Sequence, residues 1–178
     1  VNELRRRVKV AERCVVETGQ HRLDALVILR LAGGAEGAKR AAVECSPGTF
    51  VFWDKGYSDL CPEQPFEPAA VVVTRVISLP ETTRICLDLG HKSIAAENEI
   101  TRRVYFPDAP SLNPLGQSEE HLVLEAGAGH SFKVGDILYG IPFHVCPTIA
   151  LYERAITVSN GKTNGEWKIV ARDRKITV

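Results

Sequence analysis

The sequence lacks the features that mark membrane, nucleic-acid-binding or secreted proteins. It has no apolar run near the roughly 18 to 20 residues that span a bilayer and no signal-peptide pattern at its start. Its 22 basic and 22 acidic residues cancel, so no overall field attracts polyanions. The cysteines number five, an odd count, and form no CxxC pair, which argues for a reducing compartment. We expect a cytoplasmic protein without nucleic-acid or membrane partners.

Methionine is also absent, even at position 1. Because natural reading frames normally begin with methionine, we expect the chain to be a fragment. The remaining composition is that of an ordinary globular protein, with 44% hydrophobic and 25% charged residues. A chain of 178 residues can hold one sizeable core, or one domain and a piece of another.

The hydrophobic pattern divides the chain near residue 42. Residues 1–18 repeat apolar side chains at steps of three and four, as one face of a helix does. Residues 25–31 read as a short buried strand, with a buried helical turn as the alternative. From residue 43, runs rich in Val, Ile and Thr alternate with Gly, Pro and Asn, which predicts β structure. The expected strands are residues 49–54, 69–78, 83–89, 120–125, 136–145, 154–159 and 166–173. We therefore predict two units, residues 1–42 and a β domain over residues 43–178.

Three local features refine this prediction. Residues 105–118 contain three prolines and no period, which predicts a loop. Asn160-Gly161 and Asn164-Gly165 lie between the last two expected strands, and Asn-Gly pairs favour tight hairpin turns. Trp53 is expected to be a core or interface aromatic.

His144 and Cys146 are the main candidates for chemistry. On a strand, side chains two residues apart share a face about 7 Å apart at the backbone, so these two could bind one ion. Imidazole and thiolate both suit zinc and related metals. A buried structural cysteine beside an unrelated histidine remains the alternative. The sequence offers no second pair for a closed four-ligand site, so a metal here would occupy an open site.

Two further groups are weaker candidates. Glu119 and His121 stand two residues apart before a predicted strand, where they could orient a ligand or move a proton; a salt-bridged strand end is the alternative. Gly90 could mark a bulge or the close approach of another backbone. Lys92 is either a Schiff-base lysine or an ordinary surface lysine.

A series of motifs, taken in order, resembles the C-terminal region of D-threonine aldolase-like and D-serine dehydratase-like enzymes. The motifs are ECSPGTFVFWDKGYSD, RICLDLGHKSIAAE, QSEEHLVLE, VGDILYGIPFHVCPT and WKIVARDR. They extend over roughly residues 43–178. Ordered agreement across several motifs is more specific than any one of them.

The resemblance implies a fold and a set of cofactors. Enzymes of this family resemble alanine racemase (fold type III): a (β/α) barrel carries pyridoxal phosphate, and a C-terminal β domain, barrel-like or sandwich-like, packs against it. Residues 1–42 would then be the helical end of that barrel. His144 and Cys146 would bind a divalent metal (Zn, Mn or Mg) that holds the hydroxyl of a β-hydroxy D-amino acid. The metal would assist retro-aldol cleavage as a Lewis acid, and the cofactor would take up the electron pair released at Cα.

The chain departs from the family pattern in its cofactor residues. It has no lysine segment of the family's Pro-His-x-Lys type, and LAGGAEGAK matches the phosphate-binding stretch badly. Pyridoxal phosphate is therefore expected on a missing barrel, with no contact assigned to a numbered residue here. The resemblance also implies a homodimer. Dehydratase-type elimination, racemisation, and a non-catalytic β domain for docking or dimerisation are the alternatives.

Overall fold

A computed structural model describes residues 49–173 of the protein. In chain order, its elements are the 3-10 helix η2 (Thr49–Val51), α3 (Lys55–Leu60), β1 (Val72–Glu81), β2 (Arg84–Leu87), η3 (Ile100–Arg102), β3 (Val104–Tyr105), β4 (Asn113–Gln117), β5 (Leu122–Glu125), β6 (Ile137–Pro142), α4 (Val145–Ile149), β7 (Arg154–Ser159), β8 (Lys162–Lys168) and η4 (Val170–Arg172). The fold is mainly β, as predicted. Within these residues, no helix is both long and apolar enough to cross a membrane.

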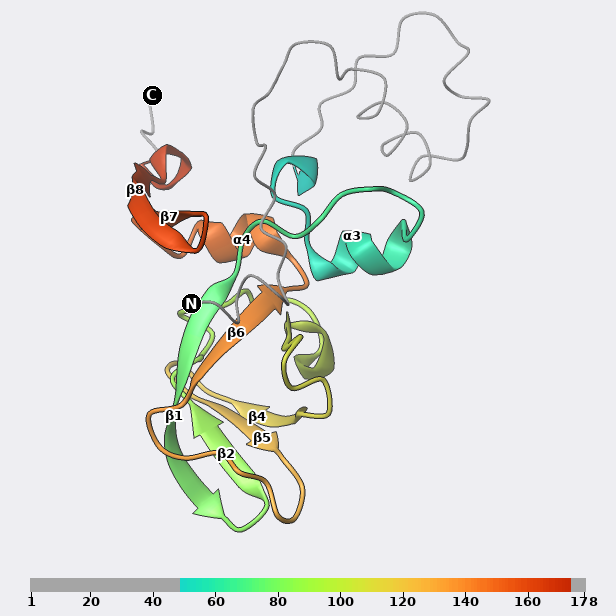
Figure 1. Ribbon diagram of the computed structural model, residues 1–178, viewed down its shortest axis with the longest axis vertical. Helices are drawn as coiled ribbons and strands as arrows, with labels where there is room; N and C mark the ends of the chain where they lie inside the picture. Colours follow the sequence, from blue (N-terminus) through green and yellow to red (C-terminus); the bar gives the residue numbers. More distant parts are fainter. Residues whose placement is uncertain (1–48, 174–178) are drawn as a thin grey trace, which may run out of the picture.

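A curled antiparallel sheet forms the body of the fold (Figure 1). Its strand order is β3-β6-β1-β2-β5-β4, and every pairing is antiparallel. The first half of β1 pairs with β6, and its second half pairs with β2 through two register shifts. Such irregularities bend a strand and increase its twist. This bending lets β1 belong to both halves of the sheet and curls the sheet into a half-barrel.

The concave side of the sheet holds the main core. Along β1, Val72, Thr74 and Val76 are buried while Val73 and Arg75 point to solvent, the alternation that a strand with one covered face requires. The other strands, and the loops between them, add Ile85, Leu87, Leu89, Ile94, Val104, Phe106, Leu122, Leu124 and Leu138 to the same cluster.

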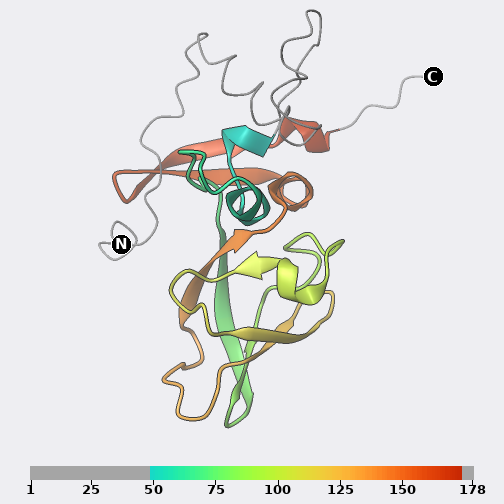
Figure 2. The same cartoon turned by 90° about the vertical axis from the view of Figure 1, so that its right-hand side faces the viewer.

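Helices α3 and α4 lie together beyond the end of β6, next to the β7–β8 hairpin (Figure 2). A small second core sits at this end, where Trp53 is 1% exposed and packs against Tyr57 and Phe66. The prediction that Trp53 is a core aromatic is confirmed.

Most of the predicted strands are confirmed. β1, β2, β5, β6 and β7 fall within or beside the predicted runs, and β7 and β8 form the closing hairpin. The turn is Asn160-Gly161, whose φ values of 52° and 69° are those of a tight hairpin turn. The Asn164-Gly165 pair lies within β8 instead. The predicted helix over residues 1–18, the strand over residues 25–31 and the boundary after residue 42 lie outside the described residues.

Other predictions are wrong. Residues 49–54 form no strand: η2 is followed by Trp53 in the left-handed region (φ 48°) and by Asp54, the N-cap of α3. Residues 105–118 are not only a loop, because they contain β4 and the last residue of β3. Pro114 is accommodated because β4 is an edge strand with a register shift between Pro114 and Gly116. The run 166–173 turns into η4 after Lys168.

Asp88 makes the stability of the sheet dependent on pH. Its carboxylate accepts hydrogen bonds from the Thr74 hydroxyl (2.7 Å), the Arg75 amide (2.7 Å) and the Arg75 guanidinium (3.3 Å). Burial acts to raise the pKa of Asp88, but these hydrogen bonds outweigh it and hold the pKa below 3.8. A group whose pKa is lower in the folded state stabilises the fold above its ordinary pKa. That stabilisation is lost as the pH falls through the folded-state pKa.

We therefore expect Asp88→Asn to lower the free energy of unfolding by about 1 to 2 kcal/mol at neutral pH. The difference from wild type should shrink as the pH falls below about 4. Urea unfolding at a series of pH values measures this, with Glu67→Gln, an exposed carboxylate, as the control. A difference that persists unchanged under acidic conditions would contradict the assigned role.

Candidate functional site

The chain turns from strand to helix between the two candidate metal ligands. β6 ends at Pro142, His144 is the N-cap of α4 with an extended backbone (φ −137°, ψ 99°), and the helix begins at Val145. Pro147 lies in the first turn, where its missing N–H leaves no helical hydrogen bond unmade. The prediction that His144 and Cys146 alternate along one strand is therefore wrong, because the backbone becomes helical between them.

Asp54 fixes the start of α4. Its side chain, in a residue only 1% exposed, accepts hydrogen bonds from the Tyr57 amide in α3 (2.9 Å) and the Val145 amide in α4 (3.0 Å). The Gly56 amide also donates to the Phe143 carbonyl (3.2 Å). One buried carboxylate thus satisfies an N–H at the first turn of each helix, which such groups require. The α3–α4 junction places His144 and Cys146.

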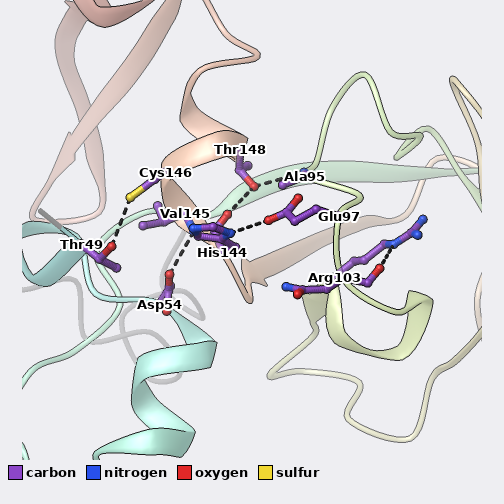
Figure 3. A network of polar contacts seen from close by, with 10 residues as sticks. Thr49, Asp54, Ala95, Glu97, Arg103, His144, Val145, Cys146 and Thr148 are labelled. Atoms are coloured by element: carbon purple, nitrogen blue, oxygen red, sulfur yellow. Dashed lines mark hydrogen bonds and ion pairs between the residues drawn. The ribbon is translucent and has the colours of Figure 1, made fainter. Parts of the chain in front are cut away.

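The two candidate side chains contact different partners (Figure 3). The Cys146 Sγ lies 3.1 Å from the Thr49 hydroxyl, and this cysteine is exposed. The His144 Nδ1 contacts the Glu97 Oε1 on the other side of the first turn of α4. Both groups are open to solvent, but the structure does not aim them at one point.

A segment before η3, residues 93–97, runs along α4 and carries Glu97. The Tyr152 hydroxyl donates to the Ser93 carbonyl (2.7 Å), and the Ala95 amide donates to the Thr148 hydroxyl (3.2 Å). Thr148 is 3% exposed and in turn donates to the His144 carbonyl (2.8 Å). This segment, the α4 strap, therefore places Glu97 beside His144.

The weaker candidates form a charged cluster elsewhere. The Lys92 ammonium lies 2.8 Å from both Glu119 and Glu120, so the alternative of a salt-bridged strand end is confirmed. These hydrogen bonds, first to Glu119 and then to Glu120, raise the pKa of Lys92. His121 is exposed, and its amide donates to the Ser118 hydroxyl (3.3 Å). Gly90 is the predicted close approach: a Cβ there would lie 2.0 Å from the Glu119 carbonyl oxygen.

Tyr57 adds a polar group to the α3–α4 junction. Burial, followed by the negative charge of Asp54, raises the pKa of the Tyr57 phenol above 10.0, although a hydrogen bond to Thr49 acts in the opposite direction. The phenol therefore stays protonated at neutral pH.

Sequence patterns did not reveal Asp54, Glu97 or Thr148. An aspartate directly before a helix is a recognisable N-cap signal. This signal could have identified Asp54, which precedes α3. Glu97 lies in a segment without period, 47 residues from His144, and carries no such signal.

The described part of the chain, residues 49–173, contains no cluster of three or more His, Cys, Asp or Glu side chains arranged to hold a metal ion. His144 and Cys146 therefore stand as two possible donors. A cation on both would keep its other positions open to water or substrate.

Comparison with known proteins gives relatives of one kind. The chain is 30% identical over 151 residues to D-threonine aldolase of Arthrobacter sp., a match that covers 80% of this chain and 39% of that protein. The fold resembles that of D-threonine aldolase from Filomicrobium marinum, with a TM-score of 0.64, 26% identity, and coverage of 72% of this chain and 36% of the other. The chain thus spans about two fifths of the length of these relatives.

A third similar structure is D-threo-3-hydroxyaspartate dehydratase from Delftia sp. HT23. It has a TM-score of 0.54 and 19% identity and covers 68% of this chain and 38% of the other, so this likeness shows the fold alone. The model of the family described as the putative serine dehydratase domain matches residues 69–158. That match includes the curled sheet, α4 and both candidate ligands and extends over half of the chain, so the chain belongs to the putative serine dehydratase domain family.

Proposed function

We propose that this chain is the metal-bearing β domain of a pyridoxal-phosphate-dependent lyase that acts on β-hydroxy D-amino acids. The observation that carries the proposal is the likeness to D-threonine aldolase in sequence, at 30% identity across 80% of the chain, and in fold. It favours retro-aldol cleavage as the reaction. Dehydratase-type elimination is the alternative, because the matching family is described as a serine dehydratase domain.

The groups at the start of α4 suit a divalent cation. His144 contacts a carboxylate through Nδ1, the arrangement that metal-binding histidines usually have, and this leaves Nε2 for a ligand. Cys146 is exposed, so a cation could reach it without unpacking the core. Among Zn²⁺, Mn²⁺ and Mg²⁺, an imidazole and a thiolate favour Zn²⁺. A cation bound there would supply Lewis-acid polarisation of a substrate hydroxyl.

The chain's own residues would hold and orient this donor set. Asp54 fixes the first amide of α4, and the α4 strap fixes the N-cap carbonyl through Thr148. His144 and Cys146 therefore start from a defined backbone.

Pyridoxal phosphate does not fit the lysine considered from the sequence. Two carboxylates hold Lys92 as an ion pair and raise its pKa, whereas a Schiff-base lysine is activated by a lowered pKa. We therefore propose that the cofactor binds to the barrel that the family resemblance implies. No residue of this chain is given a role in the chemistry of the cofactor.

Two variants of D-threo-3-hydroxyaspartate dehydratase motivate the choice of mutations. Solved structures include a histidine-to-alanine variant and a metal-free cysteine-to-alanine variant, and the two replaced positions lie two residues apart. His144 and Cys146 have the same spacing. At 19% identity, the likeness to that enzyme shows a shared fold only. The shared spacing is therefore a reason to mutate His144 and Cys146, but it does not identify them as metal ligands.

We expect the purified protein to bind one divalent cation and Cys146→Ala or His144→Ala to abolish most of that binding. Loss of a direct ligand should weaken affinity by more than the roughly 10- to 100-fold that loss of an outer-shell partner causes. Titration of Zn²⁺ and Mn²⁺ followed by calorimetry measures the dissociation constants. His91→Ala, an exposed histidine, and Cys86→Ala, a buried cysteine in β2, are matched controls.

The natural gene product that contains this chain, supplied with pyridoxal phosphate, tests the reaction. Release of acetaldehyde from D-threonine that is lost in Cys146→Ala supports the proposal. Ammonia and a keto acid in place of acetaldehyde would favour elimination. Equal, negligible cation binding in wild type and both variants would remove the metal site.

A docking or dimerisation role is a second candidate for the chain by itself. The β7–β8 hairpin has only two strands, and it leaves Ile156 62% and Trp167 58% exposed. Two-stranded hairpins are marginal without a covering surface, and exposed apolar groups in such a place favour a partner. A homodimer, which the family resemblance implies, is the partner that we propose, and light scattering of wild type against Trp167→Ser tests it.

A further inference from the structure

The contact between Glu97 and His144 can orient the imidazole only if the surrounding backbone holds both residues in place. The Glu97 Oε1 contacts the His144 Nδ1, and the two side chains are 44% and 45% exposed. Ion pairs between groups this exposed usually contribute little to stability. A contact of this kind therefore matters only if the backbone on both sides is fixed.

The α4 strap fixes the backbone on both sides. Ala95 donates to Thr148 within α4, and the Ser93 carbonyl accepts from the hydroxyl of Tyr152, which follows the helix. Glu97 meets His144, the N-cap of α4. These contacts hold the strap against the helix at its start, its middle and just beyond its end.

The buried Thr148 ties the strap to the N-cap itself. Its hydroxyl accepts from the Ala95 amide and donates to the His144 carbonyl. Glu97 lies two residues beyond Ala95, and the imidazole of His144 projects from the residue whose carbonyl is held. The contact between them is thus one end of a continuous hydrogen-bonded chain.

The contact selects one tautomer of a neutral imidazole. Such a ring has one N–H and one lone pair, and a carboxylate can only accept. The hydrogen therefore belongs on Nδ1, and the lone pair is left on Nε2. A carboxylate on one ring nitrogen also makes the other a stronger ligand.

We propose that Glu97 is a positioning residue that holds His144 in the Nδ1–H tautomer and so presents the Nε2 lone pair to a divalent cation. The cation part of this inference rests on the proposed function, whereas the tautomer part does not. Glu97 does not itself bind the cation.

Ring ¹⁵N chemical shifts of His144 in the cation-free protein test the tautomer directly. At a pH of about 8, the neutral ring of His144 in wild type should carry its hydrogen on Nδ1. Glu97→Ala should move the hydrogen largely to Nε2, the usual preference of an unconstrained imidazole. Glu97→Gln keeps a side-chain oxygen acceptor and should restore much of the Nδ1–H form.

Cation affinity is the second measurement. Glu97→Ala should weaken Zn²⁺ binding by about 10- to 100-fold, and Glu97→Gln should weaken it less. Glu99→Ala is the matched control, because Glu99 is an exposed glutamate two residues further along that makes no capping hydrogen bond to η3. Circular dichroism of each variant checks that the fold is kept.

The outcomes separate this inference from the proposed function. A changed tautomer with weaker binding in Glu97→Ala supports both. If wild type binds the cation and Glu97→Ala has the same tautomer and the same affinity as wild type, the role of Glu97 is overturned and the metal site stands. If wild type binds no cation, the metal site fails, and the ¹⁵N shifts alone decide whether Glu97 orients His144.

Discussion

Gly90→Ala should destabilise the fold by about 3 to 5 kcal/mol. The added Cβ would lie 2.0 Å from the Glu119 carbonyl oxygen, 2.1 Å from its carbon and 2.2 Å from the Glu120 nitrogen. All three atoms belong to the backbone, so no side chain can move aside. Relief of the clash must separate the two segments. The separation would stretch the hydrogen bonds from the His91 and Lys92 amides to the carbonyls of residues 118 and 119.

Gly116→Ala is the matched control for this effect. An ideal Cβ at Gly116 meets no atom within 4 Å, so we expect a change of less than about 0.5 kcal/mol, or a gain of up to about 1 kcal/mol through the unfolded state. Urea unfolding of both variants supplies the comparison. Equal free energies of unfolding for the two would show that residues 118–120 yield readily, contrary to the packing described.

The sequence predicted the parts of the fold that depend on local patterns. Runs rich in Val, Ile and Thr, set between Gly, Pro and Asn, located β1, β2, β5, β6 and β7. Asn160-Gly161 located the hairpin turn because few residue pairs accept positive φ at two positions in succession. Gly90 was recognised for a similar reason, since a glycine among strand residues often marks close backbone approach.

The sequence failed where tertiary contacts overrode a local preference. The apolar run that ends at Trp53 has the composition of a strand, but Asp54 caps α3 and reaches the amide of Val145, 91 residues away. Pro114 argued against a strand, yet an edge position tolerates a missing N–H. Neither the bond from Asp54 to Val145 nor the edge position of β4 is encoded within a window of neighbouring residues.

The candidate site divides in the same way. Spacing alone singled out His144 and Cys146, but it assumed a strand, and the helical turn after His144 gives the two side chains different partners. Asp54 carries a local N-cap signal, but its bond to Val145 and the position of Glu97 beside His144 become visible only in the fold. A short motif can identify candidate metal ligands, whereas the directions of their side chains depend on the surrounding packing.

Asp54→Ala should lower the free energy of unfolding by about 2 to 4 kcal/mol. The buried carboxylate accepts from the Tyr57 and Val145 amides at 2.9 and 3.0 Å, and alanine would leave both donors buried without that acceptor. Hydrogen bonds to a charged group contribute more than neutral ones, so the loss should exceed that of an ordinary N-cap. Thermal and urea unfolding at neutral pH measure it.

Asp54→Ser separates the two roles of this side chain. Serine can still cap α3 by accepting from the Tyr57 amide, but its single, shorter side-chain oxygen cannot also reach Val145. It should therefore recover about 1 kcal/mol of the stability lost in Asp54→Ala, while the start of α4 stays untethered. Because His144 and Cys146 flank Val145, Zn²⁺ affinity should stay reduced in Asp54→Ser even though the helix cap is restored. Full recovery of both stability and affinity in this variant would mean that the bond to Val145 does not position the site.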